Sequence, residues 1–210
     1  MKDIIDLNIL IINGSPRPQG QISQMLDIMR SEAEAKGAHV EVVSTNRLSI
    51  KPCIGCMACR TRNKCLLAED DSQRVLKMMQ DADVVIMGAP CYWGNIPGQM
   101  KLLFDRIVYG LMQDSQRFPI PLMKGKQCIL VSTCTTPWPF NIFFNQSHGA
   151  IRAMREICHY SGFKIVKTIE RGGTHKKPQL TEKDKKKCLK AILSVLKHPY
   201  EQNTESKAPK

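Results

Sequence analysis

Short apolar runs alternate with amphipathic segments along this chain, and the alternation limits the possible folds more than any other feature. Five apolar runs have the length of buried strands, at 7–12, 40–43, 84–87, 127–132 and 163–169. Between them, apolar residues recur at helical spacing, as in Met100, Leu103, Phe104 and Ile107. Strands that alternate with helices favour a parallel sheet with right-handed crossovers and helices on both faces.

The sequence therefore predicts an α/β three-layer sandwich with five parallel strands in the flavodoxin-like order 2-1-3-4-5. One domain over 1–198 accounts for the pattern, with a cysteine-rich loop at 52–67 and a polar segment, 199–210, expected to be a disordered tail. Asp70 or Asp71 is a candidate helix N-cap, and Thr181 opens another helix. Ligands of such sheets bind beyond the carboxyl ends of the strands, so the loops after the first, third and fourth strands carry the candidate site.

Composition restricts the partners and the compartment. The 210 residues include 31 Lys and Arg against 19 Asp and Glu, a net charge of +12, and nine cysteines. No apolar run approaches the ~20 residues that span a bilayer, and the acidic start is unlike a signal peptide, so a cytoplasmic protein without a membrane partner is expected. A solvated helix face explains the basic charge most simply. Attraction of an acidic redox protein or an anionic cofactor is the functional alternative, and no nucleic-acid partner is expected because no binding motif accompanies the charge.

Four cysteines, Cys53, Cys56, Cys59 and Cys65, fall within one short segment with the spacing C-x2-C-x2-C-x5-C. Closely spaced thiolates of this kind hold cubane iron–sulfur clusters, whereas zinc sites more often use two separated C-x2-C pairs. Cysteines that pack only as small apolar groups are the alternative. The spacing favours a metal or redox role.

The loop after the first strand, residues 14–23, leads into a helix N-terminus and is a candidate anion site. Ser15 and Ser23 offer hydroxyl groups, Arg17 offers a guanidinium, and Gly20 permits close approach of the backbone. Neither the P-loop motif nor the dinucleotide fingerprint is present. An ordinary strand-to-helix turn is the alternative.

The loop after the third strand contains adjacent aromatic residues. Tyr92 and Trp93 could lie beside a planar ring, and Gly94 and Asn95 leave room and backbone donors for the edge of a heterocycle. Aromatic side chains that only cover the end of the sheet are the alternative.

Taken together, these motifs resemble the NADPH-dependent FMN reductase family and, within it, the iron–sulfur flavoprotein branch. The resemblance rests on Ile-Asn-Gly-Ser-Pro-Arg at 12–17, the cysteines at 53–65, Asp70-Asp71, Gly-Ala-Pro-Cys-Tyr-Trp-Gly-Asn at 88–95, Met100-Lys101 and Phe104-Asp105-Arg106. It covers most of residues 7–175.

The resemblance implies a flavodoxin-like fold that binds FMN non-covalently. It assigns the phosphate to Ser15, Arg17, Gly20, Gln21, Ile22 and Ser23. It assigns the isoalloxazine to Pro90, Tyr92, Trp93, Gly94 and Asn95. In the iron–sulfur branch, Cys53, Cys56, Cys59 and Cys65 would hold a [4Fe–4S] cluster. Where the family often has Asn-Thr, this chain has Gln21-Ile22, so Ser23 or a backbone N–H would have to replace the missing hydroxyl.

The resemblance also implies a homodimer or homotetramer and an FMN-dependent oxidoreductase. Electrons would pass from NAD(P)H or a reduced redox protein through FMN, with or without the cluster, to a quinone-like, flavin or other small acceptor. No catalytic residue is assigned, because the flavin carries the chemistry. The alternatives are an electron-transfer protein that works with ferredoxin, and a cysteine-based redox sensor.

Overall fold

A five-stranded parallel sheet forms the centre of the computed structural model, which describes residues 4–115 and 117–197. Its strands are β1 (Asn8–Asn13), β2 (His39–Ser44), β3 (Val84–Pro90), β6 (Gln127–Thr133) and β7 (Lys164–Arg171). The order β2-β1-β3-β6-β7 confirms the predicted order 2-1-3-4-5. The expected tail at 199–210 lies outside the described residues.

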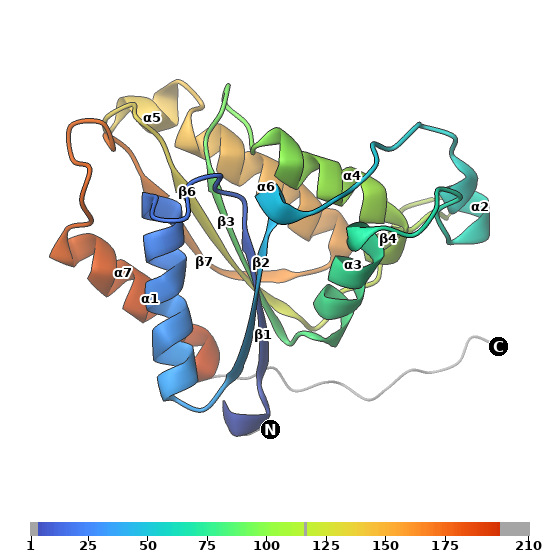
Figure 1. Cartoon of the computed structure of the whole chain (residues 1–210), viewed down its shortest axis with the longest axis horizontal. Helices are drawn as coiled ribbons and strands as arrows, with labels where there is room; N and C mark the ends of the chain where they lie inside the picture. The colour runs from blue at the N-terminus through green and yellow to red at the C-terminus, as the bar shows by residue number, and fades with distance from the viewer. Residues whose placement is uncertain (1–3, 116, 198–210) are drawn as a thin grey trace.

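Helices cover both faces of the sheet and complete the three layers (Figure 1). One face carries α1 (Gln21–Ala35) and α7 (Glu182–Leu196), and the other carries α3 (Asp71–Asp81), α4 (Gly98–Leu111) and α6 (Ser147–Ser161). Successive strand residues enter opposite cores, as Ile9 and Leu10 do in β1. Every residue of β6 is buried, which is why the central strands read as continuous apolar runs.

Helix starts follow the predicted capping chemistry. The Asp70 carboxylate accepts the Ser72 N–H at 2.9 Å and caps α3, and Thr181 caps α7 in a box with Asp184. Within the described ranges, no helix is long and apolar enough to cross a membrane.

Several short elements were not predicted. They are the 3₁₀ turns η1 (Ile4–Asp6) and η2 (Thr45–Arg47), the hairpin of β4 (Met112–Gln113) with β5 (Ile120–Pro121), and the helices α2 (Ala58–Arg62) and α5 (Phe140–Phe143). The α5 helix lies in the segment after β6, where the sequence predicts only a loop after the fourth strand. Elements of two to five residues are too short to display a hydrophobic period.

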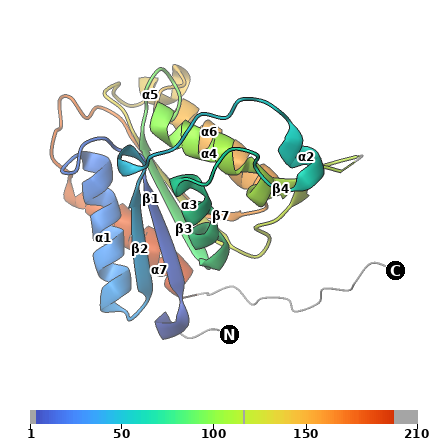
Figure 2. The same ribbon diagram turned by 45° about the vertical axis from the view of Figure 1, so that its right-hand side comes forward.

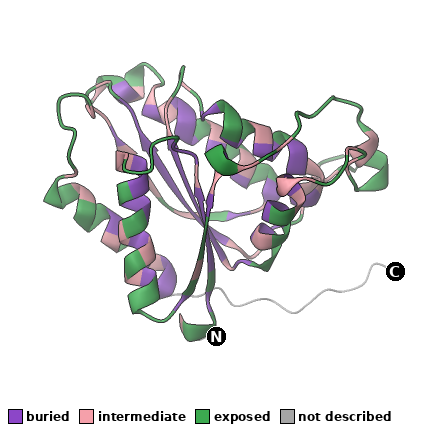
Figure 3. Cartoon of the chain, viewed as in Figure 1, coloured by how far each residue is buried: buried purple, intermediate pink, exposed green. Residues whose placement is uncertain are grey.

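The two candidate sites lie at different places on this framework. The loops after β1, β3 and β6 meet at the carboxyl edge of the sheet, whereas α2 lies at the outer edge of the molecule, beyond α3 and α4 (Figure 2). Figure 3 shows the sheet largely buried and the segment around α2 largely exposed.

Candidate active-site cleft and cysteine cavity

One cleft of about 840 Å³ opens at the carboxyl edge of the sheet and brings together loops that are far apart in sequence. Seven of the predicted cofactor-binding residues line it: Ser15, Arg17, Gly20, Gln21, Ile22, Pro90 and Tyr92. Residues 133–135, after β6, form a further part of the lining. Ser23, Trp93, Gly94 and Asn95 are not among the residues that line the cleft.

The loop after β1 is shaped by its own hydrogen bonds. Asn13 Oδ1 accepts the Ser15 N–H at 2.9 Å, and Ser15 Oγ accepts the Arg17 N–H at 3.2 Å. Ser23 Oγ donates to the Arg17 carbonyl at 2.8 Å and accepts from Asn13 Nδ2 at 2.9 Å. Ser23 therefore stabilises the conformation of the loop through these two hydrogen bonds, whereas Ser15 and Arg17 line the cleft.

The loop delivers the start of a fifteen-residue helix to the cleft. Gly20 is the N-cap of α1 and makes no side-chain capping bond, and a Cβ there would lie 3.1 Å from the Arg17 carbonyl oxygen. Uncapped N–H groups and the positive end of the helix dipole favour an anion. The Arg17 side chain is exposed beside them. This end of the cleft is thus suited to a phosphate group.

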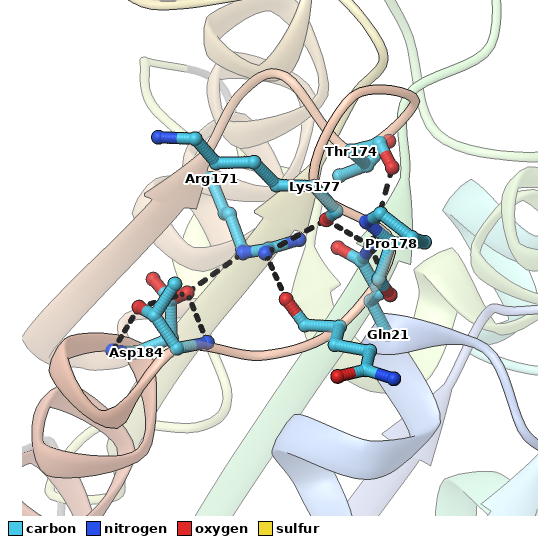
Figure 4. Close-up of polar contacts among 8 residues, drawn as sticks. Gln21, Arg171, Thr174, Lys177, Pro178 and Asp184 are labelled. Atoms are coloured by element: carbon cyan, nitrogen blue, oxygen red, sulfur yellow. Dashed lines mark hydrogen bonds and ion pairs between the residues drawn. The ribbon is translucent and has the colours of Figure 1, made fainter.

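Gln21 reaches across the cleft to a segment that the sequence did not link to it. Its Nε2 donates to the carbonyls of Pro178 at 2.8 Å and Lys177 at 3.1 Å (Figure 4). Thr174 and Pro178 line the cleft, so segment 174–178 forms a wall of the cleft. The side-chain amide of Gln21 is thus committed to the wall.

Arg171 stabilises the same segment, 174–178, through hydrogen bonds and an ion pair. Its Nη2 donates to the carbonyls of Lys177 at 3.0 Å and Gln179 at 2.7 Å, and its Nε pairs with Asp184 Oδ2 at 2.9 Å (Figure 4). Burial raises the pKa of Asp184, but hydrogen bonds from Thr181 and the Arg171 guanidinium lower it more, so the net shift is downward. No local motif marked this wall, because it depends on carbonyl groups and on tertiary contact.

The loop after β3 is a tight two-residue turn. Tyr92 and Asn95 exchange both backbone hydrogen bonds, at 2.9 and 3.0 Å, around Trp93 and Gly94, whose φ angles are +53° and +67°. Positive φ at both central positions is the type I′ geometry, and it is strained for tryptophan. A Cβ on Gly149 would lie 2.0 Å from the Gly94 carbonyl oxygen, so the first turn of α6 packs directly against this turn. Sequence reasoning missed the contribution of Gly149.

The four predicted metal ligands line a separate cavity of about 150 Å³. Cys53 and Cys56 are exposed, and Cys59 and Cys65 are partly buried. Burial raises the pKa of Cys59; a backbone hydrogen bond opposes this, and the three other thiols raise the pKa further. The shared space of the four thiols is shown by the cavity that all of them line.

Four thiols at this spacing are a donor set of the kind that iron–sulfur clusters use. Among residues 4–115 and 117–197, no three His, Cys, Asp or Glu side chains form a group that could hold one metal ion. The four thiols nevertheless line one cavity.

Arg106 of α4 attaches both ends of the cysteine segment to the domain. Its side chain is fully buried; Nη1 donates to the Lys51 carbonyl at 2.9 Å, and Nη2 pairs with Asp70 Oδ2 at 3.2 Å. Burial raises the pKa of Asp70, but hydrogen bonds from Ser72 and Lys51 and the charge of Arg106 outweigh it and lower the pKa. The cavity contacts α4 from Asp105 to Tyr109, whereas no residue of α4 lines the cleft, so the two sites share no lining residue.

The parallel sheet and the cleft at its carboxyl edge define a flavodoxin-like α/β protein. The sequence model of the NADPH-dependent FMN reductase family matches residues 7–139, more than half of the chain. The chain belongs to this family of oxidoreductases, and the resemblance indicated by its motifs is confirmed.

Individual relatives point to the same family. The iron–sulfur flavoprotein MJ1083 of Methanocaldococcus jannaschii is 35% identical over 100 residues, 48% of this chain and 51% of the relative. An iron–sulfur flavoprotein of Clostridioides difficile is 30% identical over 127 residues, 60% of this chain and 53% of the relative. The chain thus spans about half the length of these curated relatives. An azoreductase from Bacillus anthracis shares the fold, with a TM-score of 0.70 and 16% identity over 91% of this chain and 99% of that one.

Proposed function

We propose that the chain is an FMN-dependent oxidoreductase that binds FMN non-covalently in the cleft at the carboxyl edge of the sheet. The observation that carries the proposal is that a single cleft joins the loop after β1 to the loop after β3. A phosphate at one end and a planar ring at the other need this combination of an anion site and an aromatic loop.

The phosphate is placed at the start of α1. Ser15, Arg17 and the N–H groups of Gln21 and Ile22 surround this end, and Ser23 supports them indirectly through Arg17. The Gly20 N–H donates to the Arg17 carbonyl at 3.0 Å, so Gly20 contributes the close approach of the backbone rather than a donor. The N–H groups replace the hydroxyl that Ile22 does not supply.

The isoalloxazine is placed against Pro90 and Tyr92. The type I′ turn, with Trp93, Gly94 and Asn95, fixes the position of the loop and exposes its backbone. When bound, FMN supplies the redox chemistry, and the protein residues orient it and exclude water.

The donor we propose is NAD(P)H or a reduced redox protein, and the acceptor is a quinone-like compound, a flavin or another small planar molecule. The family to which the chain belongs supports this reaction class. The exposed aromatic side chain of Tyr92 beside the cleft suits a flat acceptor.

Anaerobic titration with FMN, followed by flavin fluorescence, tests the proposal. FMN should bind more tightly than riboflavin, and Arg17→Gln should weaken FMN binding while leaving riboflavin binding nearly unchanged. Arg62→Gln, in the cysteine segment, is the matched control and should have no effect. If the protein binds no FMN even at high concentration, and is colourless once free FMN has been removed, the proposal is contradicted.

Electron transfer through a [4Fe–4S] cluster, with ferredoxin as partner, is the second candidate. The four-thiol cavity, with Cys53 and Cys56 exposed at the molecular edge, favours it. Rapid reduction by ferredoxin with negligible NAD(P)H turnover would select this function. Reduction by NAD(P)H alone would select the reductase.

We also propose a homodimer or homotetramer. Large aromatic side chains are exposed on the 92–95 turn and around α5: Trp93, Trp138, Phe143 and Phe144. Exposed apolar groups gathered in this way are typical of interaction surfaces. Light scattering during size-exclusion chromatography measures the mass, and a monomer would contradict the expectation.

A further inference from the structure

Two cysteines outside the four-cysteine segment line the proposed flavin cleft. Cys91 follows β3 and Cys134 follows β6, and both are free thiols. The strands are parallel neighbours with Pro90 opposite Thr133, and the Cys91 N–H donates to the Thr133 carbonyl at 2.8 Å. Cys91 and Cys134 are therefore the next pair in this register. Neighbouring strands lie about 4.8 Å apart, within the ~4.4–6.8 Å range of Cα separations that disulfides span.

Both side chains emerge on the face of the sheet that α4 and α6 cover. Cys91 packs against the same core as Ala89, and Cys134 continues the alternation of Cys128 and Leu130, which belong to that core. The two thiols also meet the same helix end. Cys91 Sγ lies 4.0 Å from Gln146 Oε1, and Ser147 lowers the pKa of the Cys134 thiol. Cys134 Sγ itself donates to the Thr136 carbonyl at 3.4 Å.

The surroundings of the pair act on the two thiols in opposite directions. The N-terminus of α6 stabilises thiolates, and Gly94 and Asn95 supply further backbone hydrogen bonds to Cys91. Burial is the larger effect and raises the pKa of both thiols, and the Cys134 thiol raises that of Cys91 further. Cys91 is only partly buried, so one member of the pair remains accessible from the cleft.

We propose that Cys91 and Cys134 form a redox-active dithiol–disulfide pair that exchanges electrons with the FMN of the same cleft. The inference rests on the proposed function. In one direction, reduced flavin gives up two electrons and two protons, the S–S bond breaks, and each sulfur takes up one proton. In the other direction, the two thiols lose two electrons and two protons to oxidised flavin and the S–S bond forms.

Counting electrons tests the exchange. The FMN-loaded protein is treated anaerobically with a mild thiol oxidant, freed of the oxidant and titrated with dithionite. The unmodified protein should take up two electrons per flavin more than Cys91→Ser or Cys134→Ser. Any cluster contributes equally to all three proteins, because Cys53, Cys56, Cys59 and Cys65 are retained.

Cys188→Ser is the matched control. Cys188 is buried in the opposite core, under α7, and does not line the cleft, so this variant should match the unmodified protein. Peptide mass mapping should find a Cys91–Cys134 cross-link in the oxidised protein and none once the flavin is reduced.

If the unmodified protein and Cys91→Ser take up equal numbers of electrons, the proposed exchange between the cysteine pair and FMN is contradicted. A Cys91–Cys134 cross-link that persists beside reduced flavin would contradict it as well. These results would leave FMN binding intact. A chain that binds no FMN would overturn the proposed function and the exchange together, so the two failures are distinguishable.

Discussion

The cleft at the carboxyl edge and the cysteine segment are supported in different ways. The cleft is built on the ends of three buried strands. Hydrogen bonds of Asn13 and Ser23 shape the loop after β1, and Gln21 joins the end of that loop to segment 174–178. The cysteine segment has every residue from 51 to 57 exposed and contains one helix of only five residues. Arg106 attaches it to α4 near its two ends.

The difference indicates what each site needs from its ligand. A cleft positioned by rigid strands is largely formed before a cofactor binds. A loop with little burial of its own gains order when thiolates bind a metal, because the binding free energy then contributes to folding. We therefore expect substitutions in the cysteine segment to change metal content and substitutions around the cleft to change flavin affinity. Neither kind of substitution should have much effect on the ligand of the other site.

Removing one thiol should have the largest effect. Cys59→Ala takes one of four ligands from the cavity, so iron in the anaerobically purified protein should fall from about four per chain to nearly none. Flavin content should be unchanged because no residue of the cysteine segment lines the cleft. Elemental analysis and absorption spectra measure both. Iron that persists in Cys59→Ala would contradict the assignment, and zinc in place of iron would make the cysteines a structural site.

Arg106→Leu tests the attachment of the cysteine segment. The substitution leaves the Asp70 carboxylate and the Lys51 carbonyl without their partner, and breaking a buried pair in this way costs about 3–5 kcal/mol. Urea denaturation should detect the loss of stability. Arg74→Leu is the control, because the Arg74–Asp71 pair is exposed and should contribute less than about 1 kcal/mol. Similar costs for both variants would contradict the role given to Arg106.

The sequence predicted the strands, their order and the two cleft loops because these depend on local pattern. A parallel strand covered on both faces is an unbroken apolar run, and the strand order fixes which loops meet. Seven of the predicted residues accordingly line one cleft. The caps of two helices were predicted for the same reason: Thr181 was expected to cap α7, and of the two candidates Asp70 and Asp71 it is Asp70 that caps α3.

The rest of the site depends on contacts between segments that are far apart in the sequence. Gln21 binds carbonyl groups more than 150 residues away, and Gly149 is needed only because the Gly94 carbonyl lies against it. Carbonyl groups carry no sequence signal, and a helical glycine has several possible causes. The pairing of Cys91 with Cys134 likewise becomes visible only when the strand register is known.

Gly149→Ala tests how firmly α6 supports the ring-binding loop. The added methyl group would lie 2.0 Å from the Gly94 carbonyl oxygen, so the turn has to move. Overpacking of this kind costs about 1–3 kcal/mol, and if the strain falls on the bound state, FMN affinity should drop about 5- to 150-fold. Gly98→Ala is the control, since a Cβ there meets nothing within 4 Å. Unchanged FMN affinity in Gly149→Ala would contradict support of the loop by α6.

The wall at 174–178 should show the smallest effect, as a dependence of stability on acid pH. The folded pKa of Asp184 lies below its ordinary value of 3.8, because the hydrogen bonds from Thr181 and Arg171 outweigh burial. The unfolded chain therefore binds more protons, so the contribution of Asp184 is fully present above that value and is lost as the pH falls through the folded pKa. Asp184→Asn should lower the urea midpoint near pH 6 and flatten its decline toward pH 3, whereas Glu34→Gln, an exposed carboxylate on α1, should change neither. An Asp184→Asn profile parallel to that of the unmodified protein would mean that Arg171 holds the wall without the carboxylate.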